Sequence, residues 1–457
     1  YPAGTHGGNE ILCYADVEAI RVKHNSPCGL KVLLQEAWER FHLPMAITEA
    51  QLNSTREEQL KWLYEIWNTC LELKNVGVDV RAVTAWSILG AFGWNSLLTS
   101  SRMEYEPGVF DIRSGSLRAT ALAGMIEALS ANKKYFHPLL NEKGWWHRQS
   151  RFHNCNTTDK PRNFSLKNNN CKPILIIGKT GTLGKAFARI CEERHISYRL
   201  LGREDIDITD AQQIENIIKQ HNPWAIINTA GFVKVDEAEE NVKNCFNSNT
   251  VGPLLLASAC KKYLLQFLTF SSDLVFDGKK HSPYYESDEV NPLNVYGKSK
   301  ADAEYLVLKT HNEALVVRTS SFFSPWDKYN FIHHVIETVS SNNNLVAASD
   351  ITMSPTYVPD LVNVCLDLLI DKEKGIWHLT NKGETTWAQL AKRVAEQALL
   401  DANKIIAQES GLMNWTATRP KYSVLKSLNG NLLPSLNNAL NRYFEDTLKI
   451  KTGVEVY

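Results

Sequence analysis

Apolar and amphipathic stretches alternate along the chain from Pro173 onward. The apolar runs are short, which predicts strands, and the stretches between them carry apolar residues on one helical face. This alternation predicts an α/β fold in which helices cover both faces of a parallel sheet. The expected strands are 173–178, 197–202, 225–230 and 265–272, and the expected helices are 183–195, 211–220, 250–263 and 296–309.

The first 144 residues have a different order of elements. An apolar run at 43–52 predicts a buried strand that ends in Glu49, and a second run at 78–89 predicts a buried strand that ends near Trp86. The helix expected between them begins with a capping box and has one apolar face. Its residues are Thr55 and Glu58 for the capping box and Leu60, Leu63, Trp67 and Leu71 for the face.

Residues 145–171 are rich in Asn, Lys and Arg and poor in aliphatic side chains, which predicts a linker. A chain of 457 residues is too long for one core. We therefore expect one domain at 1–144 and another at 172–450. Because the chain begins at Tyr1, we also expect its natural beginning to lie further upstream.

The amino-acid composition excludes some classes of binding partner. Lys and Arg number 50, as do Asp and Glu, so the zero net charge argues against a nucleic acid or an anionic membrane as partner. The nine cysteines stand singly, which predicts reduced cytoplasmic thiols and neither disulfides nor a metal site. No apolar run is long enough to span a bilayer.

A glycine-rich turn follows the first strand of the second domain. The phrase Gly178-Lys-Thr-Gly-Thr-Leu-Gly184 lies between an expected strand and an expected helix. Such glycines allow a tight turn and a close approach to a pyrophosphate, which the helix N-terminus then binds. We therefore predict a dinucleotide site. Its loop residues are Gly178, Thr180, Gly181, Leu183 and Gly184.

The second strand ends in Gly202 and Arg203, where an NAD-specific site usually has an acidic residue. An arginine suits the 2′-phosphate of NADPH, so NADPH is favoured as cofactor. NADH stays open, because Glu204 or Asp205 could reach the ribose.

Tyr296 and Lys300 are four residues apart at the start of an expected helix and so share one face. A nearby ammonium favours the phenolate, so we expect a lowered pKa for Tyr296 and a phenol that can donate a proton to a carbonyl. The preceding strand ends in Ser271 and Ser272, which supply a third polar group. The set predicts reduction of a ketone.

These phrases also carry a family resemblance. Residues 173 to about 448 resemble the extended short-chain dehydrogenase/reductases, and within them the dTDP-4-dehydrorhamnose reductase family. The matching phrases are NTAGFVKVDEAE (228–239), FSSDLVFDG (270–278), PYYESDEVNPLNVYGKSKADAE (283–304), LVVRTSSFF (315–323), SPTYVPD (354–360), GIWHLTNKGETTWAQLA (375–391) and RPKYSVL (419–425).

The resemblance implies a Rossmann fold with a small C-terminal substrate-binding subdomain. It implies NADPH-dependent reduction of the 4-keto group of a nucleotide-activated deoxysugar, as in the formation of dTDP-L-rhamnose, and it leaves a homodimer open. The implied residues are Ser272, Tyr296 and Lys300 for catalysis; Asp207, Ile208, Asn228, Thr229, Ala230, Gly231 and Asn249 for the cofactor; and Asp273, Arg318 and Arg419 for the substrate. Arg419 could equally be a structural salt-bridge partner.

The sequence departs from the family pattern at three places. Leu274 stands where the family often has a sugar-contacting tyrosine, Ser272 stands for a common threonine, and Ile351 stands for the glutamine of an Asp-Gln pair. These changes leave the hydride chemistry intact and the identity of the sugar open.

The first domain resembles the C-terminal end of glycoside hydrolase family 1 barrels. The resemblance places Glu49 at the position of the nucleophile, but the second carboxylic acid that retaining hydrolysis needs lies on an earlier strand that this sequence lacks. Ala50 and Gln51 replace the Asn-Gly pair after the nucleophile, and Gly93 replaces a sugar-contacting glutamate. We therefore expect a partial TIM-barrel-like segment fused to a reductase.

Two alternatives remain beside the reductase. One is a regulatory subunit that binds a sugar nucleotide or NADP without catalysis, since the same family includes the methionine adenosyltransferase beta subunit. The other is a glycosidase that uses Glu49, which the missing second carboxylate disfavours.

Overall fold

The computed structural model describes residues 7–8, 13–14, 29–93, 105–148 and 171–452. They fall into two compact units. Unit 1 comprises Tyr1–Ile88 and Met125–Asn169, and unit 2 comprises Leu89–Gly124 and Asn170–Tyr457. The segment Leu89–Gly124 therefore groups with the C-terminal part of the chain, whereas the sequence suggested a single boundary in the linker.

Unit 2 is built on a six-stranded sheet in the order β10-β9-β11-β12-β13-β18, with every neighbouring pair parallel. The strand order reverses between β9 and β11, and the carboxyl ends of strands at such a reversal form a crevice that binds nucleotides. The strands are β9 (Ile174–Ile177), β10 (Tyr198–Leu201), β11 (Ala225–Asn228), β12 (Gln266–Ser272), β13 (Leu315–Thr319) and β18 (Gly375–His378).

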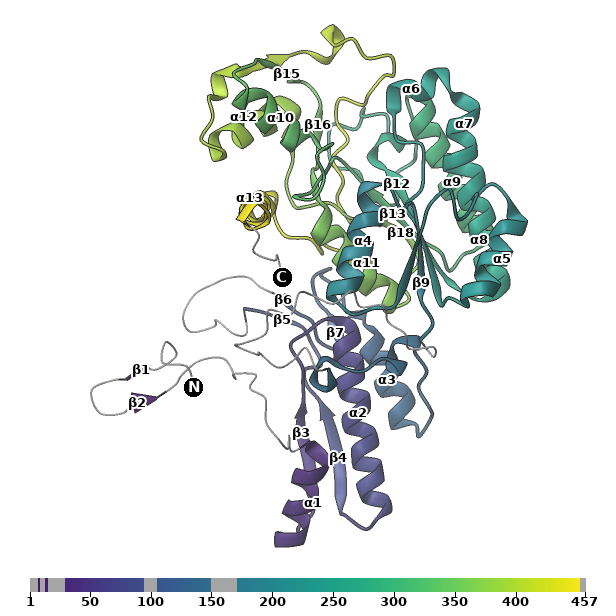
Figure 1. Cartoon of the computed structure of the whole chain (residues 1–457), viewed down its shortest axis with the longest axis vertical. Coiled ribbons are helices and arrows are strands. Elements are labelled where there is room, and N and C mark those ends of the chain that lie inside the picture. The colour runs from purple at the N-terminus through teal and green to yellow at the C-terminus, as the bar shows by residue number, and fades with distance from the viewer. Residues whose placement is uncertain (1–6, 9–12, 15–28, 94–104, 149–170, 453–457) are drawn as a thin grey trace. The chain divides into compact units, whose positions relative to one another are not determined.

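Helices cover both faces of this sheet, with α4 and α11 on one face and α5, α8 and α9 on the other (Figure 1). The predicted α/β fold with a parallel sheet is confirmed. The π-helical turn Asn247–Val251 precedes α8 and lies where a plain helix was expected. The helices are α4 (Thr182–Glu193), α5 (Ala211–His221), α6 (Val235–Glu240), α7 (Val242–Phe246), α8 (Gly252–Tyr263), α9 (Val295–Thr310) and α11 (Val358–Ile370).

A smaller subdomain follows from insertions after β13 and β18. Its core packs two helices against a two-stranded sheet, with Phe323, Tyr357 and Tyr443 among its buried side chains. Its elements are α10 (Phe331–Ser340), β15 (Leu345–Ala348), α12 (Trp387–Gln397), β20 (Ile405–Gln408) and α13 (Leu436–Thr452), with the short strands β14 (Phe322–Phe323), β16 (Thr352–Met353), β17 (Thr356–Tyr357) and β19 (Thr385–Thr386).

Unit 1 contains α1 (Leu30–Phe41), β3 (Met45–Ala50), α2 (Arg56–Asn75) and β4 (Val80–Ala85). The two strands pair in parallel, and α2 joins them as the sequence predicted. Most side chains of both strands are exposed or half-buried, contrary to the expected burial, because within the described part of unit 1 one helix layer packs on them.

The expected capping box at the start of α2 does not form. Thr55 is the N-cap residue, but its hydroxyl donates to Glu57 at 2.5 Å instead of accepting from the helix backbone. Glu58 accepts from the backbone N–H of Trp145 at 2.9 Å and pairs with Lys61. The start of the expected linker is also folded, since Trp145–His147 form a 3₁₀ turn whose Trp146 is buried.

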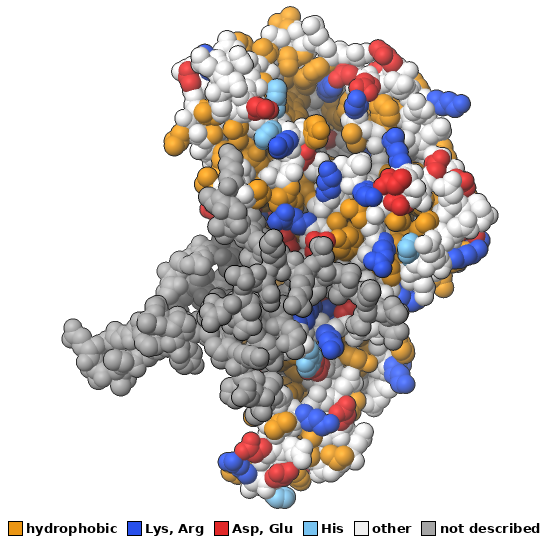
Figure 2. Space-filling view, in the orientation of Figure 1, with side chains coloured by type: hydrophobic (Ala, Val, Ile, Leu, Met, Phe, Trp, Pro, Cys, Tyr) orange, Lys and Arg blue, Asp and Glu red, His pale blue; other side chains and the backbone are white. Residues whose placement is uncertain are grey.

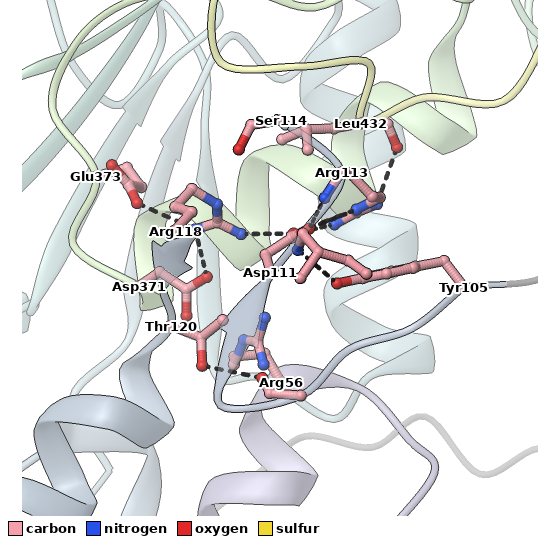
Figure 3. A network of polar contacts seen from close by, with 12 residues as sticks. Arg56, Tyr105, Asp111, Arg113, Ser114, Arg118, Thr120, Asp371, Glu373 and Leu432 are labelled. Carbon is pink, nitrogen blue, oxygen red and sulfur yellow. Dashed lines mark hydrogen bonds and ion pairs between the residues drawn. The ribbon is translucent and has the colours of Figure 1, made fainter. Parts of the chain in front are cut away.

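Residues 105–120 form short strands that join unit 2 through buried ion pairs (Figure 3). These strands are β6 (Tyr105–Glu106), β7 (Phe110–Asp111) and β8 (Arg118–Ala119); β5 (Ala91–Phe92) pairs with β6, and α3 (Ala121–Ser130) follows. Arg118 donates to Asp371 at 2.9 Å, to Glu373 at 3.0 Å and to Asp111 at 3.0 Å. Ion pairs of Arg118 thus attach the segment 105–120 to the turn between α11 and β18.

Basic and acidic side chains are intermixed on the face of the molecule in Figure 2. In the part of the chain that the structure describes, no helix is both long enough and apolar enough to cross a bilayer.

Candidate active site

The glycine-rich turn lies between β9 and α4, as the sequence predicted. Gly178 has φ of 120°, and a Cβ there would lie 2.3 Å from Thr229 Oγ1. A Cβ at Gly184 would lie 2.1 Å from the carbonyl oxygen of Gly178. Both positions therefore require glycine, and the turn leaves the first N–H groups of α4 directed toward the crevice. Thr180 and Gly181 belong to the same turn, and Leu183 lines the cavity next to it.

Arg203 is exposed immediately beyond β10. Beside it, Lys179 of the glycine turn donates to Glu204 at 2.7 Å. Asp207 accepts hydrogen bonds from the backbone and the hydroxyl of Thr209, which lower the pKa of its carboxyl, and Ile208 is half-buried nearby. The edge expected to bind the adenosine thus presents two basic side chains, Arg203 and Lys179, and two acidic ones, Glu204 and Asp207.

The loop after β11, residues 228–231, lines the cavity at the strand-order reversal. Asn228 is buried and donates to Thr269 at 3.1 Å, which fixes the start of the loop against β12. Thr229 donates to the carbonyl oxygen of Ile177 at 2.7 Å and ties the loop to β9. Ala230 and Gly231 complete it.

Asn249 lies in the π-helical turn and is fully buried. Its Oδ1 accepts from the N–H of Phe232 at 2.8 Å, and its Nδ2 donates to the carbonyl of Phe232 and to the Ser299 hydroxyl, each at 3.0 Å. All these partners belong to the protein, so Asn249 holds the loop after β11 against α9. Single-turn π-helices often mark functional sites.

Ser272, Tyr296 and Lys300 all line one cavity of about 510 Å³. Ser272 ends β12, and α9 begins beside it because Asn294 caps the helix by accepting from the N–H of Gly297 at 2.7 Å. Lys300 Nζ lies 5.9 Å from the centre of the Tyr296 ring and donates to the carbonyl of Phe270 at 3.1 Å. The structure thus brings the three predicted catalytic residues together.

The electrostatics of this set differ from the expectation. Burial raises the pKa of Tyr296, and the charge of Asp273 adds to that effect, whereas hydrogen bonding with Ser272 lowers it. Burial also lowers the pKa of Lys300 to about 8, so its ammonium is still the major form at pH 7, but burial dominates and the pKa of the tyrosine rises instead of falling. Tyr296 is consequently held as a neutral phenol, the form that can donate a proton.

The three residues expected at the substrate lie in different environments. Asp273 is buried in the cavity wall. Arg419 lines the cavity, stacks on Trp415 at 4.5 Å and pairs with both oxygens of Asp236, so it makes a salt bridge and is also positioned at the cavity.

Arg318 lies outside the set of residues that line the cavity. Its guanidinium donates to both carboxylate oxygens of Glu304, at 2.8 and 2.7 Å, and to His378 at 3.2 Å. The arginine is 2% exposed. The geometry therefore gives Arg318 a structural ion pair between β13 and α9.

The outer wall of the cavity is apolar and was not predicted. It comes largely from the subdomain, where side chains from four separate stretches of the chain face the reacting groups. No local spacing signals this, because the stretches meet only through the subdomain fold. The wall residues are Phe322, Phe331, Val346, Ile351, Met353, Trp387, Met413 and Trp415, and Leu274 lines the cavity next to Ser272.

Comparison with known proteins assigns this architecture. A family model described as the RmlD substrate binding domain matches residues 172–445. The chain belongs to this family. The match covers the parallel sheet, the glycine turn, the serine-tyrosine-lysine set and most of the subdomain.

Several similar proteins are named dTDP-4-dehydrorhamnose reductase. The dTDP-4-dehydrorhamnose reductase of Aggregatibacter actinomycetemcomitans is 32% identical over 241 residues, covering 51% of this chain and 81% of the relative. That of Streptomyces griseus is 30% identical over 257 residues, covering 55% of this chain and 84% of the relative. The crystal structure of the Bacillus anthracis reductase in complex with NADP is 29% identical, with a TM-score of 0.58, and covers 60% of this chain and 99% of that one.

Proposed function

We propose that unit 2 is an NADPH-dependent reductase of the 4-keto group of a nucleotide-activated deoxysugar, with dTDP-4-dehydro-L-rhamnose as the leading substrate. The observation that carries the proposal is the placement of Ser272, Tyr296 and Lys300 in one cavity beside a glycine turn of the dinucleotide-binding type. Relatives named dTDP-4-dehydrorhamnose reductase, one of them in complex with NADP, support it.

The residues of the cavity divide the work of carbonyl reduction. When bound, NADPH supplies the hydride. The neutral phenol of Tyr296 donates its proton to the carbonyl oxygen, and the hydroxyl of Ser272, which donates to Asp273 before the substrate binds, turns to donate to the same carbonyl and polarises it. Lys300, with a pKa of about 8, can take up or release a proton near neutral pH one helical turn from the tyrosine.

The glycine turn fits a dinucleotide, because the close approach of Gly178 and Gly184 leaves no side chain between β9 and the start of α4. Arg203 and Lys179 would hold the 2′-phosphate of NADPH, and Glu204 would compete for the lysine. The free thiols of Cys70, Cys245, Cys260 and Cys365 support our placing the reaction in the reducing cytoplasm.

The proposal is tested by mixing purified protein with NADPH and a dTDP-4-keto sugar and following NADPH absorbance. Oxidation that depends on the sugar supports the reductase. NADPH binding without turnover would instead support the regulatory subunit, and release of the aglycone from a chromogenic glycoside would support the glycosidase.

For unit 1, we propose a partial barrel of the glycoside hydrolase family 1 type without hydrolase activity. The parallel pair β3 and β4, joined by α2, is the repeating unit of such barrels. Glu49 is exposed near the end of β3, at the position that the resemblance gives to the nucleophile. A matched Glu49→Gln variant should leave NADPH oxidation unchanged, and any glycosidase activity that this change abolishes would overturn the proposal.

A further inference from the structure

A buried carboxylate lies at the centre of a hydroxyl cluster in the cavity wall. Asp273 is 7% exposed, and it accepts hydrogen bonds from Ser272 at 3.0 Å on one oxygen and from Ser320 at 2.8 Å and Ser423 at 2.6 Å on the other. We call Ser272, Ser320 and Ser423 the serine cluster. The three hydroxyl donors satisfy the buried carboxylate, since each buried polar group needs a hydrogen-bond partner.

Three separate parts of unit 2 meet in this cluster. Ser272 ends β12 and Ser320 follows β13, and these neighbouring strands are in register at Ser272 and Thr319, so their carboxyl ends lie side by side. Ser423 comes from the stretch 419–425, about 150 residues further along, and its N–H donates to the carbonyl of Thr352 at 2.9 Å. Asp273 therefore connects the end of the sheet to the stretch that carries Arg419.

The contacts of Ser272 fix its side chain. Its oxygen accepts from the N–H of Leu274 at 3.2 Å, and its hydroxyl donates to Asp273. Ser272 and Tyr296 line the same cavity, and hydrogen bonding with the serine lowers the pKa of the tyrosine. A serine side chain held by two neighbours has one rotamer, so the oxygen stays beside the tyrosine before any substrate binds.

We propose that Asp273 is a positioning residue that acts through Ser272: it holds the serine hydroxyl next to Tyr296 and, through Ser423, fixes the Arg419 stretch against the same carbonyl site. The inference rests on the proposed reduction of a keto sugar. It differs from the role of a substrate ligand that the family resemblance implies for Asp273. Three of the roughly four acceptor positions of its carboxylate are already taken by protein hydroxyls.

Burial supports this arrangement. It raises the pKa of Asp273, while the three hydroxyl donors lower it. In the described structure the carboxylate accepts side-chain hydrogen bonds from these three serines, so removing any one of them leaves a buried oxygen less well satisfied. We expect the loss to affect catalysis, because Ser272 lies beside Tyr296 in the cavity.

A double-mutant cycle tests the inference on the full chain. Asp273→Asn, Ser272→Ala and the double variant are compared in kcat and KM with NADPH and the dTDP-4-keto sugar. If Asp273 acts through Ser272, Asp273→Asn lowers kcat roughly 10- to 100-fold in the wild type but changes it little in the Ser272→Ala background. Equal fold losses in both backgrounds would overturn the inference.

Two further variants separate positioning from a general loss of structure. Asp277→Asn is the matched control, because Asp277 lies four residues on in the same phrase and bonds Tyr284 and Asn291; it should leave kcat unchanged. Ser423→Ala removes the tie to the Arg419 stretch without touching Ser272 and should raise KM for the sugar nucleotide more than it lowers kcat. The reverse split for Ser423→Ala would count against the proposal.

If Asp273→Asn does not fold, as judged by thermal unfolding and NADPH binding, Ser320→Ala takes its place in the cycle, since it removes one hydroxyl and leaves the carboxylate. Its effect on kcat should also shrink in the Ser272→Ala background, and an undiminished effect there would refute the link. An inactive wild-type protein that binds NADPH would overturn the proposed function and this inference with it. An active wild type with additive variants would overturn this inference alone.

Discussion

Arg118 should anchor the segment 105–120 to unit 2, and Arg118→Met tests this. The guanidinium is 10% exposed and bonds Asp111, Asp371 and Glu373 (Figure 3). The side chain of Asp371 is 0% exposed and that of Asp111 is 1% exposed, so removing the arginine leaves two buried carboxylates with a weakened set of partners.

The size of the effect follows from the partners that remain. Removing one member of a buried ion pair typically costs about 3–5 kcal/mol. Asp371 still accepts from the N–H of Ala121 at 2.7 Å, and Asp111 keeps Arg113 at 2.6 Å, so we place the loss at the lower end, about 3 kcal/mol. That corresponds to a roughly 150-fold change in the unfolding equilibrium.

Urea unfolding followed by circular dichroism measures this, and the transition of unit 2 is recognised by its shift when NADPH is added. Lys374→Met is the matched control: Lys374 pairs with Glu313 at 2.8 Å, but both side chains are more than half exposed, so little change is expected. Adding Asp371→Asn to Arg118→Met removes the buried charge and should restore part of the loss. Equal effects of Arg118→Met and Lys374→Met, or no restoration by Asp371→Asn, would refute the reasoning.

The remaining predictions concern the cofactor, the acid and pH. Tyr296→Phe should reduce turnover by at least about 100-fold while NADPH binding stays near normal, because the proton donor is lost and the cavity keeps its shape; weakened binding with residual turnover would contradict the role. Arg203→Ala should weaken NADPH binding roughly 10-fold and leave NADH binding unchanged, measured by cofactor fluorescence, and equal losses for both cofactors would exclude a 2′-phosphate contact. Burial lowers the pKa of His378 from 6.5 to about 4, so the unfolded chain binds a proton that the folded chain does not, and the stability of unit 2 should fall by about 3 kcal/mol as pH drops from 6.5 to 4. His378→Asn, which keeps a donor and an acceptor, should reduce that fall, and an unchanged difference between pH 7 and pH 4.5 would rule out the histidine as its source.

Local patterns predicted the fold of unit 2 and the core of its site. The strand, glycine turn and helix at 174–193 lie within one short stretch, so steric requirements at Gly178 and Gly184 leave a direct trace in the sequence. Tyr296 and Lys300 share a helical turn, which fixes their relation before any packing is known. Relations of this range are set by backbone geometry alone.

The sequence did not predict side-chain contacts between residues that are far apart in the chain. Arg318 matches a family phrase, yet its charge is taken by Glu304 on a neighbouring helix, and no spacing in the sequence reveals that pairing. Glu58 has the spacing of a capping box but bonds Trp145, 87 residues away. The pKa of Tyr296 rises because the whole site is buried, whereas the sequence shows only the lysine beside it.

Asp371 links the segment 105–120 to the part of the chain that the family model matches. The family match begins at residue 172, so Arg118 lies outside it while Asp371 lies inside it. Asp371 lies in the turn after α11, just before β18, and Ser272 lies at the carboxyl end of β12 in the same sheet. Because strands β12, β13 and β18 are parallel, Asp371 lies at the amino ends of the strands and Ser272 at their carboxyl ends. The segment 105–120 therefore binds where it leaves the cavity open, and a loss of its ion pairs should change the stability of unit 2 more than its kcat.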